Sequence, residues 1–526
     1  MQGDNVRAEK ELFEGNEPLQ KVANETYYKI PLEQLQRIAT SLARDYNADL
    51  VTMIALDERE QLDAYTLIYV FSFSADDCFI CLSVSVPAEN PVFPSLTPFL
   101  NSAHWYEREA QDMFGLKAKG HPDPRPLVLH DVWSEDSYPL RKDFGKKSEN
   151  KNKAKKLHYD FLRVHGEGVF EVPVGPIHAG VIEPGHFRFS VLGESILYLE
   201  ARVFYTHRGV EKLCEGKNYE EVLYVVERIC GVCAFSHSVS YVSAIERLAG
   251  VTIPERAQYL RTIFLELERL YNHIGDISNI CAGVGFNFGI SQMAVLKERL
   301  QELNEKLTGS RFLRGYCIPG GVRYDLKGEE VKLLKETLAN VEKEYLEMLE
   351  IILGHEFFVS RMTGTGILSY VYAKNLGAVG PAAKASGLLK DVRKEHPHLA
   401  YSEMYFEVPL FGKGDVDCRF RVRLEEVKYS FSIIAQCLSK LSSGKIRVAM
   451  PNLPNGGFAL GYSESPRGDN YHWVKIGPDN TIDRIRIRSA SYCNWPAVAV
   501  SVPGNMIPDF PLINKSFELC YSCCDR

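Results

Sequence analysis

From residue 219 onward, apolar residues recur at helical spacing through most of the chain. The i, i+3, i+4 pattern predicts long helices that each carry one apolar stripe. These predicted helices span residues 220–248, 254–280, 291–307, 329–353 and 423–441. Long amphipathic helices bury their stripes against one another, so the pattern predicts a helix bundle. Residues 473–488 return to strand-like alternation, and we expect an irregular segment after them.

The first 144 residues follow a different pattern. Helical spacing of apolar residues predicts helices at 31–46 and 103–114. Between them lie runs rich in β-branched and aromatic residues, separated by polar turns, which predict an antiparallel sheet. These runs are residues 50–55, 65–73 and 78–86. A proline-rich tail at 120–144 completes what we expect to be a small α+β domain.

A lysine-rich segment separates the two parts. Residues 145–156 hold six lysines and no large apolar residue, so they cannot bury enough surface to offset their ordering entropy. We therefore predict an α+β domain at 1–144, a linker at 145–158 and a larger domain at 159–526. The larger domain is expected to be mainly helical with a small β region. Residues 161–205 predict this region, because apolar and polar residues alternate there between Gly-Pro and Pro-Gly turns. The overall fold class is α+β.

Composition and charge narrow the class of protein. The chain has 526 residues, of which 45% are hydrophobic and 25% charged, as in an ordinary soluble globular protein. The net charge of −7 is opposite in sign to that of a typical nucleic-acid-binding protein, so the composition does not indicate nucleic-acid binding. The longest apolar run, 66–86, is interrupted by Asp76 and Asp77, and residues 1–17 lack the apolar stretch of a signal peptide. We expect no transmembrane segment in this chain and a membrane contact only through partner subunits.

Two pairs of cysteines carry the clearest chemical signal. Cys230 and Cys233 form one C-x-x-C, and Cys520 and Cys523 form another. This spacing lets both sulfurs of a pair face one ion, so two pairs can form a site of four thiolates. Zinc is one candidate, and nickel or iron are others. A zinc ribbon usually closes a short loop, whereas these pairs lie near the two ends of a long helical core. The remaining cysteines, Cys524 included, are interpreted as bystanders.

Polar residues near the pairs belong to short motifs. Glu211 ends an Arg-Gly-Val-Glu segment, and Arg467 lies in a Ser-Pro-Arg-Gly turn. His237 follows Cys233 by four residues, so on a helix it lies over Cys233 and can donate a hydrogen bond to its sulfur. Taken singly, Glu211 would be a surface carboxylate, Arg467 an exposed charge and His237 a structural residue.

Taken in order, these motifs resemble the large subunit of nickel–iron (NiFe) hydrogenases. The segments RGVE, ERICGVCAFSH, SPRG and the later CYSC extend over most of residues 160–526. The resemblance implies a Ni-Fe(CN)2(CO) centre. Cys230 and Cys520 would be terminal thiolates on nickel, and Cys233 and Cys523 would bridge nickel to an iron that carries carbon monoxide and cyanide.

The resemblance also implies roles for other residues. The reaction would be the reversible reduction of protons to H2. Cys520 would be the first proton acceptor, and Glu211 would match the proton relay of the family. Arg467 would lie above the open metal position, where its fork of donors suits an orienting role. Ser491 is expected to hydrogen-bond a cyanide ligand, and Glu268 is expected to be a further carboxylate on the proton path.

The N-terminal part resembles the smaller hydrophilic subunit of respiratory complex I. The matching segments are WYERE at 105–109, DMFG at 112–115, GHPD at 120–123 and PLRKDF at 139–144. Fused to a hydrogenase large subunit, such a docking domain is typical of energy-converting, membrane-bound hydrogenases of the formate hydrogenlyase type. The resemblance implies H2 evolution linked to the oxidation of formate or ferredoxin, on the cytoplasmic side of the cell membrane.

The same resemblance implies partner proteins. No further clustered cysteines remain for an iron–sulfur cluster in this chain, so a 4Fe-4S cluster is expected in a separate small subunit. A ferredoxin-like iron–sulfur subunit, integral membrane subunits and either formate dehydrogenase or ferredoxin would complete the assembly. A maturation protease is also expected, because the chain stops three residues after Cys523, as processed members of the family do.

Two alternatives stay open, and two positions depart from the family pattern. The quinone-site subunit of complex I resembles this chain at Gly-Pro-Ile-His-Ala-Gly, 175–180, but it lacks the four cysteines. A scaffold subunit with structural zinc is the other alternative. Glu518-Leu519 replaces the usual Asp-Pro before Cys520, and Arg526 stands where many relatives place a metal-binding histidine, so we do not predict that ion.

Overall fold

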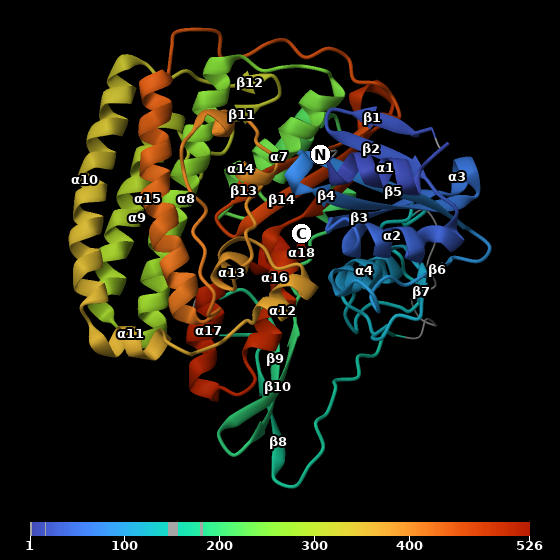
Figure 1. Cartoon of the computed structure of the whole chain (residues 1–526), viewed down its shortest axis with the longest axis horizontal. Coiled ribbons are helices and arrows are strands. Elements are labelled where there is room, and N and C mark those ends of the chain that lie inside the picture. Colours follow the sequence, from blue (N-terminus) through green and yellow to red (C-terminus); the bar gives the residue numbers. More distant parts are fainter. Residues whose placement is uncertain (1–2, 16, 146–155, 179–181) are drawn as a thin grey trace.

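The predicted helix bundle forms one side of the molecule, at the left of Figure 1. The computed structural model describes residues 3–15, 17–145, 156–178 and 182–526. Its long helices pack side by side and comprise α8 (Glu255–Val284), α9 (Asn287–Thr308), α10 (Gly328–Leu353) and α15 (Val416–Lys440). Helix α8 is buried along most of its length and ends at Gly285, whose φ of 83° lies in the left-handed region that glycine favours. The α+β prediction is confirmed.

The helix predicted at 220–248 is two helices, because the first cysteine pair interrupts it. Helix α6 (Tyr219–Val226) and helix α7 (Ala234–Leu248) flank the break. Within the break, the backbone N–H groups of Val232 and Cys233 donate to Cys230 Sγ, each at 3.3 Å. A side-chain acceptor thus replaces the carbonyls that a continuous helix would use.

The C-terminal part differs from the prediction. The residues predicted as alternating strands form β14 (Gly468–Ile476) and β15 (Ile482–Arg488), and β13 (Phe458–Ser465), which was missed, pairs antiparallel with β14. The segment expected to be irregular contains three helices, namely α16 (Ala490–Ser501), α17 (Phe510–Phe517) and α18 (Tyr521–Asp525). Helix α16 is buried along most of its length and contains Pro496, so its sequence shows no polar face, whereas α17 and α18 have only eight and five residues, too few to show a helical period.

The N-terminal sheet is mixed rather than purely antiparallel. Its strand order is β1-β2-β5-β4-β3, and β2 pairs parallel with β5. The strands are β1 (Gln20–Val22), β2 (Glu25–Lys29), β3 (Asp49–Glu58), β4 (Ala64–Phe73) and β5 (Cys78–Pro87). Helix α2 (Leu35–Arg44) connects β2 to β3, and α4 (His104–Phe114) packs against β3. The parallel pair was missed because β2 is too short to predict from its sequence pattern.

The N-terminal sheet packs directly on the rest of the chain. Trp473 of β14 donates its indole N–H to Tyr27 on β2 at 3.2 Å. Glu25, also on β2, accepts hydrogen bonds from Arg247 of α7 at 3.2 Å and from the backbone N–H of Leu460 at 3.0 Å. The predicted linker at 145–158 falls mostly on residues 146–155, which lie outside the described residues.

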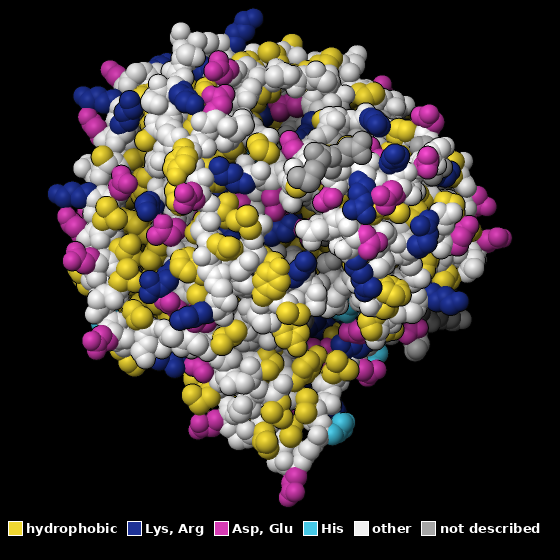
Figure 2. Space-filling view, in the orientation of Figure 1, with side chains coloured by type: hydrophobic (Ala, Val, Ile, Leu, Met, Phe, Trp, Pro, Cys, Tyr) yellow, Lys and Arg dark blue, Asp and Glu magenta, His cyan; other side chains and the backbone are white. Residues whose placement is uncertain are grey.

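A third sheet projects from the body of the molecule at the bottom of Figure 1. It consists of β8 (Val169–Val174), β9 (His186–Leu192) and β10 (Ser195–Arg202), all antiparallel. Hydrophobic side chains gather on this projection, whereas charges of both signs are interspersed elsewhere on the visible face (Figure 2). Phe170, Leu192 and Leu197 are between 40% and 52% exposed. Exposed apolar side chains grouped in this way are typical of protein–protein contacts.

None of the helices in the described ranges has the length and apolar character that a membrane span requires.

Candidate metal centre

The two cysteine pairs meet in the interior, although 290 residues separate Cys233 from Cys523. Cys230 and Cys233 lie in the break between α6 and α7, and their sulfurs are 3.0 Å apart. Cys523, on α18, places its sulfur 3.4 Å from that of Cys233. All three thiols are buried, and their sulfurs lie within 4.8 Å of one another.

Cys520 stands at the edge of this group and is half-buried. It caps α18, since its sulfur accepts the backbone N–H of Cys523 at 3.3 Å. Its thiol also hydrogen-bonds to Cys230 closely enough to lower the pKa of that group. Ser491 of α16 accepts the backbone N–H of Cys520 at 3.1 Å, so the serine predicted to lie near the site touches the second cysteine pair directly.

The donor set suits a thiolate-binding metal. Hydrogen bonds from Cys233, Cys520 and Cys523 lower the pKa of Cys230 well below its usual value. The pKa values of those three partners are raised, because hydrogen bonding and burial disfavour further negative charge beside the Cys230 thiolate. Four thiolates in one buried site need a cation to offset their repulsion, and a soft or borderline metal ion supplies it. The residues therefore fit a nickel–iron centre, and a tetrathiolate zinc ion as well.

His237 contacts a different cysteine from the one predicted. Its Nε2 lies 3.1 Å from Cys523 Sγ, on the second cysteine pair. Its Nδ1 lies 2.9 Å from Nε2 of His472 on β14. Burial lowers the pKa of His237 to about 4, so the ring is neutral at pH 7. His472 was missed from the sequence, where 235 residues separate it from its partner.

Arg467 is buried, not an exposed turn charge. It occupies the tight turn between β13 and β14, as predicted. Its guanidinium donates to Asp276 at 2.8 Å, to Asn272 at 3.2 Å and, through Nε, to the backbone carbonyl of Glu518 at 2.8 Å. This fork of bonds joins α8 to the residue two positions before Cys520. The motif predicted Arg467 but neither of its partners on α8.

Glu211 is also buried, within a cluster of charges. Gly209, which precedes α5 (Val210–Cys214), adopts a φ of 66°, the left-handed conformation that glycine favours. Glu211 then accepts from Arg484 at 2.7 Å, from the backbone N–H of Ile487 at 3.0 Å and from Arg526 at 3.2 Å. These contacts hold Glu211 against β15 and the end of the chain, and none of them reaches the four grouped cysteines.

Glu268 lies on α8 and caps the helix that follows Cys233. Its carboxylate accepts the backbone N–H groups of Phe235 at 2.6 Å and Ser236 at 3.0 Å. Burial raises its pKa to about 8, although these hydrogen bonds favour the ionised form. Its position thus anchors the start of α7, immediately after the first cysteine pair.

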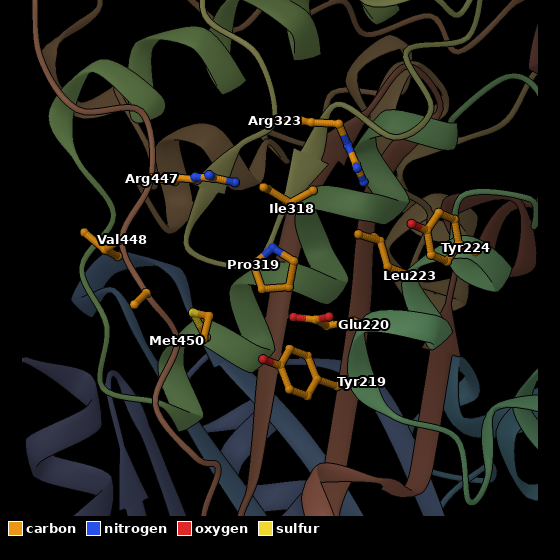
Figure 3. A pocket seen from close by; sticks show the side chains of 11 residues that line it. Tyr219, Glu220, Leu223, Tyr224, Ile318, Pro319, Arg323, Arg447, Val448 and Met450 are labelled. Carbon is orange, nitrogen blue, oxygen red and sulfur yellow. The ribbon is translucent and has the colours of Figure 1, made fainter.

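A large cavity lies away from this centre. A space of about 630 Å³ lies between α6 and the 447–450 segment, and its lining includes Tyr219, Glu220 and Arg447 (Figure 3). None of the cysteines lines it. This cavity and the grouped cysteines are therefore separate features of the structure.

Three family models match parts of this chain. A nickel-dependent hydrogenase model matches residues 208–277, which include Glu211, Cys230, Cys233 and Asp276. The model of the 30 kDa subunit of respiratory-chain NADH dehydrogenase matches residues 28–150, and that of its 49 kDa subunit matches residues 284–456. The chain thus combines hydrogenase and complex I features.

Similar proteins come from two groups. Formate hydrogenlyase subunit 5 of Escherichia coli (strain K12) is 37% identical over 91% of this chain and 84% of its own length. Hydrogenase-4 component G of the same organism is 35% identical over 94% of this chain and 87% of its own. The C/D subunit of NADH-quinone oxidoreductase from Phocaeicola vulgatus is 31% identical over 83% of this chain and 88% of its own.

Proposed function

Because the chain belongs to the energy-converting, membrane-bound branch of the NiFe hydrogenase large-subunit family, with a complex I 30 kDa-like domain fused in front, we propose that it is the catalytic subunit of a hydrogenase. Its reaction would be the interconversion of protons, electrons and H2, run toward H2 during the oxidation of formate or ferredoxin. The hydrogenase relatives and the nickel-dependent hydrogenase match support this assignment.

The observation that carries the proposal is the buried meeting of two C-x-x-C pairs. Cys230, Cys233 and Cys523 group within 4.8 Å, with Cys520 beside them. We propose that these four thiolates would hold the centre, with Cys230 and Cys520 as ligands of nickel and Cys233 and Cys523 as ligands of both nickel and iron. A bound nickel–iron centre with carbon monoxide and cyanide ligands would supply the redox chemistry of H2.

The chain's own residues would handle the protons. Cys520 is the least buried of the four thiols and is a suitable first proton acceptor. Arg467, fixed by Asp276 and Asn272, presents an oriented positive charge that does not titrate at physiological pH. Glu211 would pass protons between Cys520 and the exterior. Ser491 would orient a cyanide ligand, and His237 would donate to the Cys523 sulfur.

Partners would supply the electrons and the membrane attachment. We propose a small subunit with a 4Fe-4S cluster, a ferredoxin-like subunit and integral membrane subunits, with this chain peripheral on the cytoplasmic side. The relatives named as formate hydrogenlyase and hydrogenase-4 components support a multisubunit assembly. The exposed apolar residues of the projecting β8–β10 sheet provide a surface for one such contact.

Metal analysis and infrared spectroscopy of the purified complex test the assignment. We expect nickel and iron in equal amounts, with absorption in the carbon monoxide and cyanide stretching region. One zinc per chain and no such bands would favour the alternative, a complex I-like quinone-reducing or scaffold subunit. Full nickel occupancy without the bands would contradict the proposed diatomic ligands.

Replacing Arg467 with lysine is expected to slow hydrogen evolution roughly 100-fold, comparable to losing one preorganised electrostatic donor. An ammonium cannot reproduce the fork that reaches Asp276, Asn272 and the Glu518 carbonyl together. Nickel content should stay at the wild-type level. Arg488→Lys is the matched control, since Arg488 is equally buried but pairs with Asp469; equal losses in both variants would contradict a specific role for Arg467.

A further inference from the structure

One carboxylate in the cluster around Glu211 comes from the N-terminal part of the chain. Glu109 lies on α4 and is 6% exposed. Its Oε1 accepts from Arg486 of β15 at 2.5 Å and from Arg526 at 3.0 Å. Cation–π contacts of both guanidinium groups with the Tyr492 ring, 5.5 Å and 4.9 Å from its centroid, further fix their positions.

The same two arginines also reach Glu211. Arg486 Nη1 lies 3.5 Å from Glu211 Oε1, and Arg526 Nη1 lies 3.2 Å from the same oxygen. Arg484 contacts only the other oxygen of Glu211, at 2.7 Å. The buried cluster therefore contains three arginines and two carboxylates, and the two carboxylates share two of the arginines.

We propose that Glu109 is a positioning residue for Glu211, and that the N-terminal domain thereby completes the proton-transfer site instead of serving only to dock partners. Glu109 holds Arg486 and Arg526 between the two carboxylates. Without it, both arginines would be free to close onto Glu211. This inference rests on the proposed function, in which Glu211 relays protons.

Charge balance gives the direction of the effect. Burial favours the neutral form of Glu211, but Arg484, Arg486 and Arg526 outweigh it and lower its pKa, while the charge of Glu109 acts in the opposite direction. Two other titratable groups face Glu211, namely Cys214 on its own helix and His207 on the preceding segment. Removing the Glu109 charge leaves three arginines against one carboxylate, so the pKa of Glu211 should fall further.

The test compares Glu109→Gln with Glu107→Gln in the complete purified complex. Glu107 lies on the same helix and is buried, but it accepts from Ser95, Leu96 and Thr97 and does not touch the arginines. Nickel content, unfolding temperature and the pH profile of hydrogen evolution are measured for each, with a low-potential dye as electron donor. Glu109→Asp, which withdraws the carboxylate by one methylene, is the second variant.

We expect Glu109→Gln to keep its nickel and to shift its pH profile about one unit toward lower pH. At neutral pH the rate should fall roughly tenfold, because the protonated fraction of the relay falls tenfold for each unit of pKa. Glu109→Asp should shift in the same direction by less. Glu107→Gln should keep the wild-type profile even where its unfolding temperature falls.

The outcomes separate this inference from the proposed function. A nickel-loaded Glu109→Gln protein with the wild-type pH profile overturns the inference and leaves the hydrogenase assignment intact. If Glu109→Gln does not load nickel, the profile of Glu109→Asp decides in the same way. A wild-type complex without nickel or hydrogen turnover overturns the proposed function, and this inference with it.

Discussion

Replacing Cys523 with serine is expected to abolish nickel binding and hydrogen turnover. Its sulfur lies 3.4 Å from Cys233 Sγ and 3.1 Å from His237, so it is central to the buried donor group. A serine hydroxyl does not ionise at neutral pH and is a poor ligand for a metal that prefers sulfur. We expect metal affinity to fall by more than roughly 100-fold. Loss of a residue that only hydrogen-bonds to a metal ligand already lowers metal affinity roughly 10–100-fold, and here the ligand itself is lost.

Cys524→Ser provides the control for this substitution. Cys524 is the neighbouring residue and is fully buried, but it is not one of the grouped thiols. Its replacement also buries a serine hydroxyl, at a similar cost in stability, but leaves all four proposed metal-binding thiols in place. Nickel and iron content, measured on both purified proteins, should be lost only in Cys523→Ser. Retention of stoichiometric nickel in Cys523→Ser would contradict the assigned centre.

Replacing Glu211 with glutamine is expected to stop hydrogen evolution while the metal content stays unchanged. Glutamine has nearly the same shape but cannot carry a transferable proton. Loss of a positioned acid–base group typically costs roughly 10²–10⁴-fold in rate. The variant should also unfold at a lower temperature, because Arg484, Arg486 and Arg526 would then be balanced by Glu109 alone.

Glu215→Gln separates the relay from general charge loss nearby. Glu215 follows α5 by one residue and pairs with Lys212 at 2.9 Å, at the half-buried edge of the same segment. Its replacement should leave the rate within about twofold of wild type, because its partners, Lys212 and Lys142, do not contact Glu211. A nickel-loaded Glu211→Gln protein with full activity would contradict the assignment of Glu211 as a relay.

Sequence periodicity predicted the long helices of the bundle. Helices α8, α9 and α10 were predicted to within a few residues, whereas α15 begins at Val416, seven residues before the predicted start. Helix α16 was missed because it is buried on most sides and its sequence shows no polar face, and α17 because eight residues are too few to show a helical period. The interruption between α6 and α7 was missed for another reason, since Cys230 Sγ accepts backbone hydrogen bonds there.

Only those residues of the metal centre that belong to short sequence motifs could be predicted from the sequence. C-x-x-C spacing indicates two donors on one side of a turn, and both pairs do come together in the structure. Partners contributed by distant elements leave no such local mark. His472 contacts His237, and Asp276 contacts Arg467, in each case from a different element. Glu109 likewise contacts Arg526, and only the tertiary structure brings these pairs together.

The separation of the two cysteine pairs has a consequence for synthesis. During translation, Cys233 emerges 290 residues before Cys523, the thiol that completes the buried group. Domains generally fold as units, and α17 packs against α8 and α15, so the larger domain is completed only after its C-terminal helices have been made. The four thiols that would hold the metal therefore come together late, when α18 packs beside the break between α6 and α7.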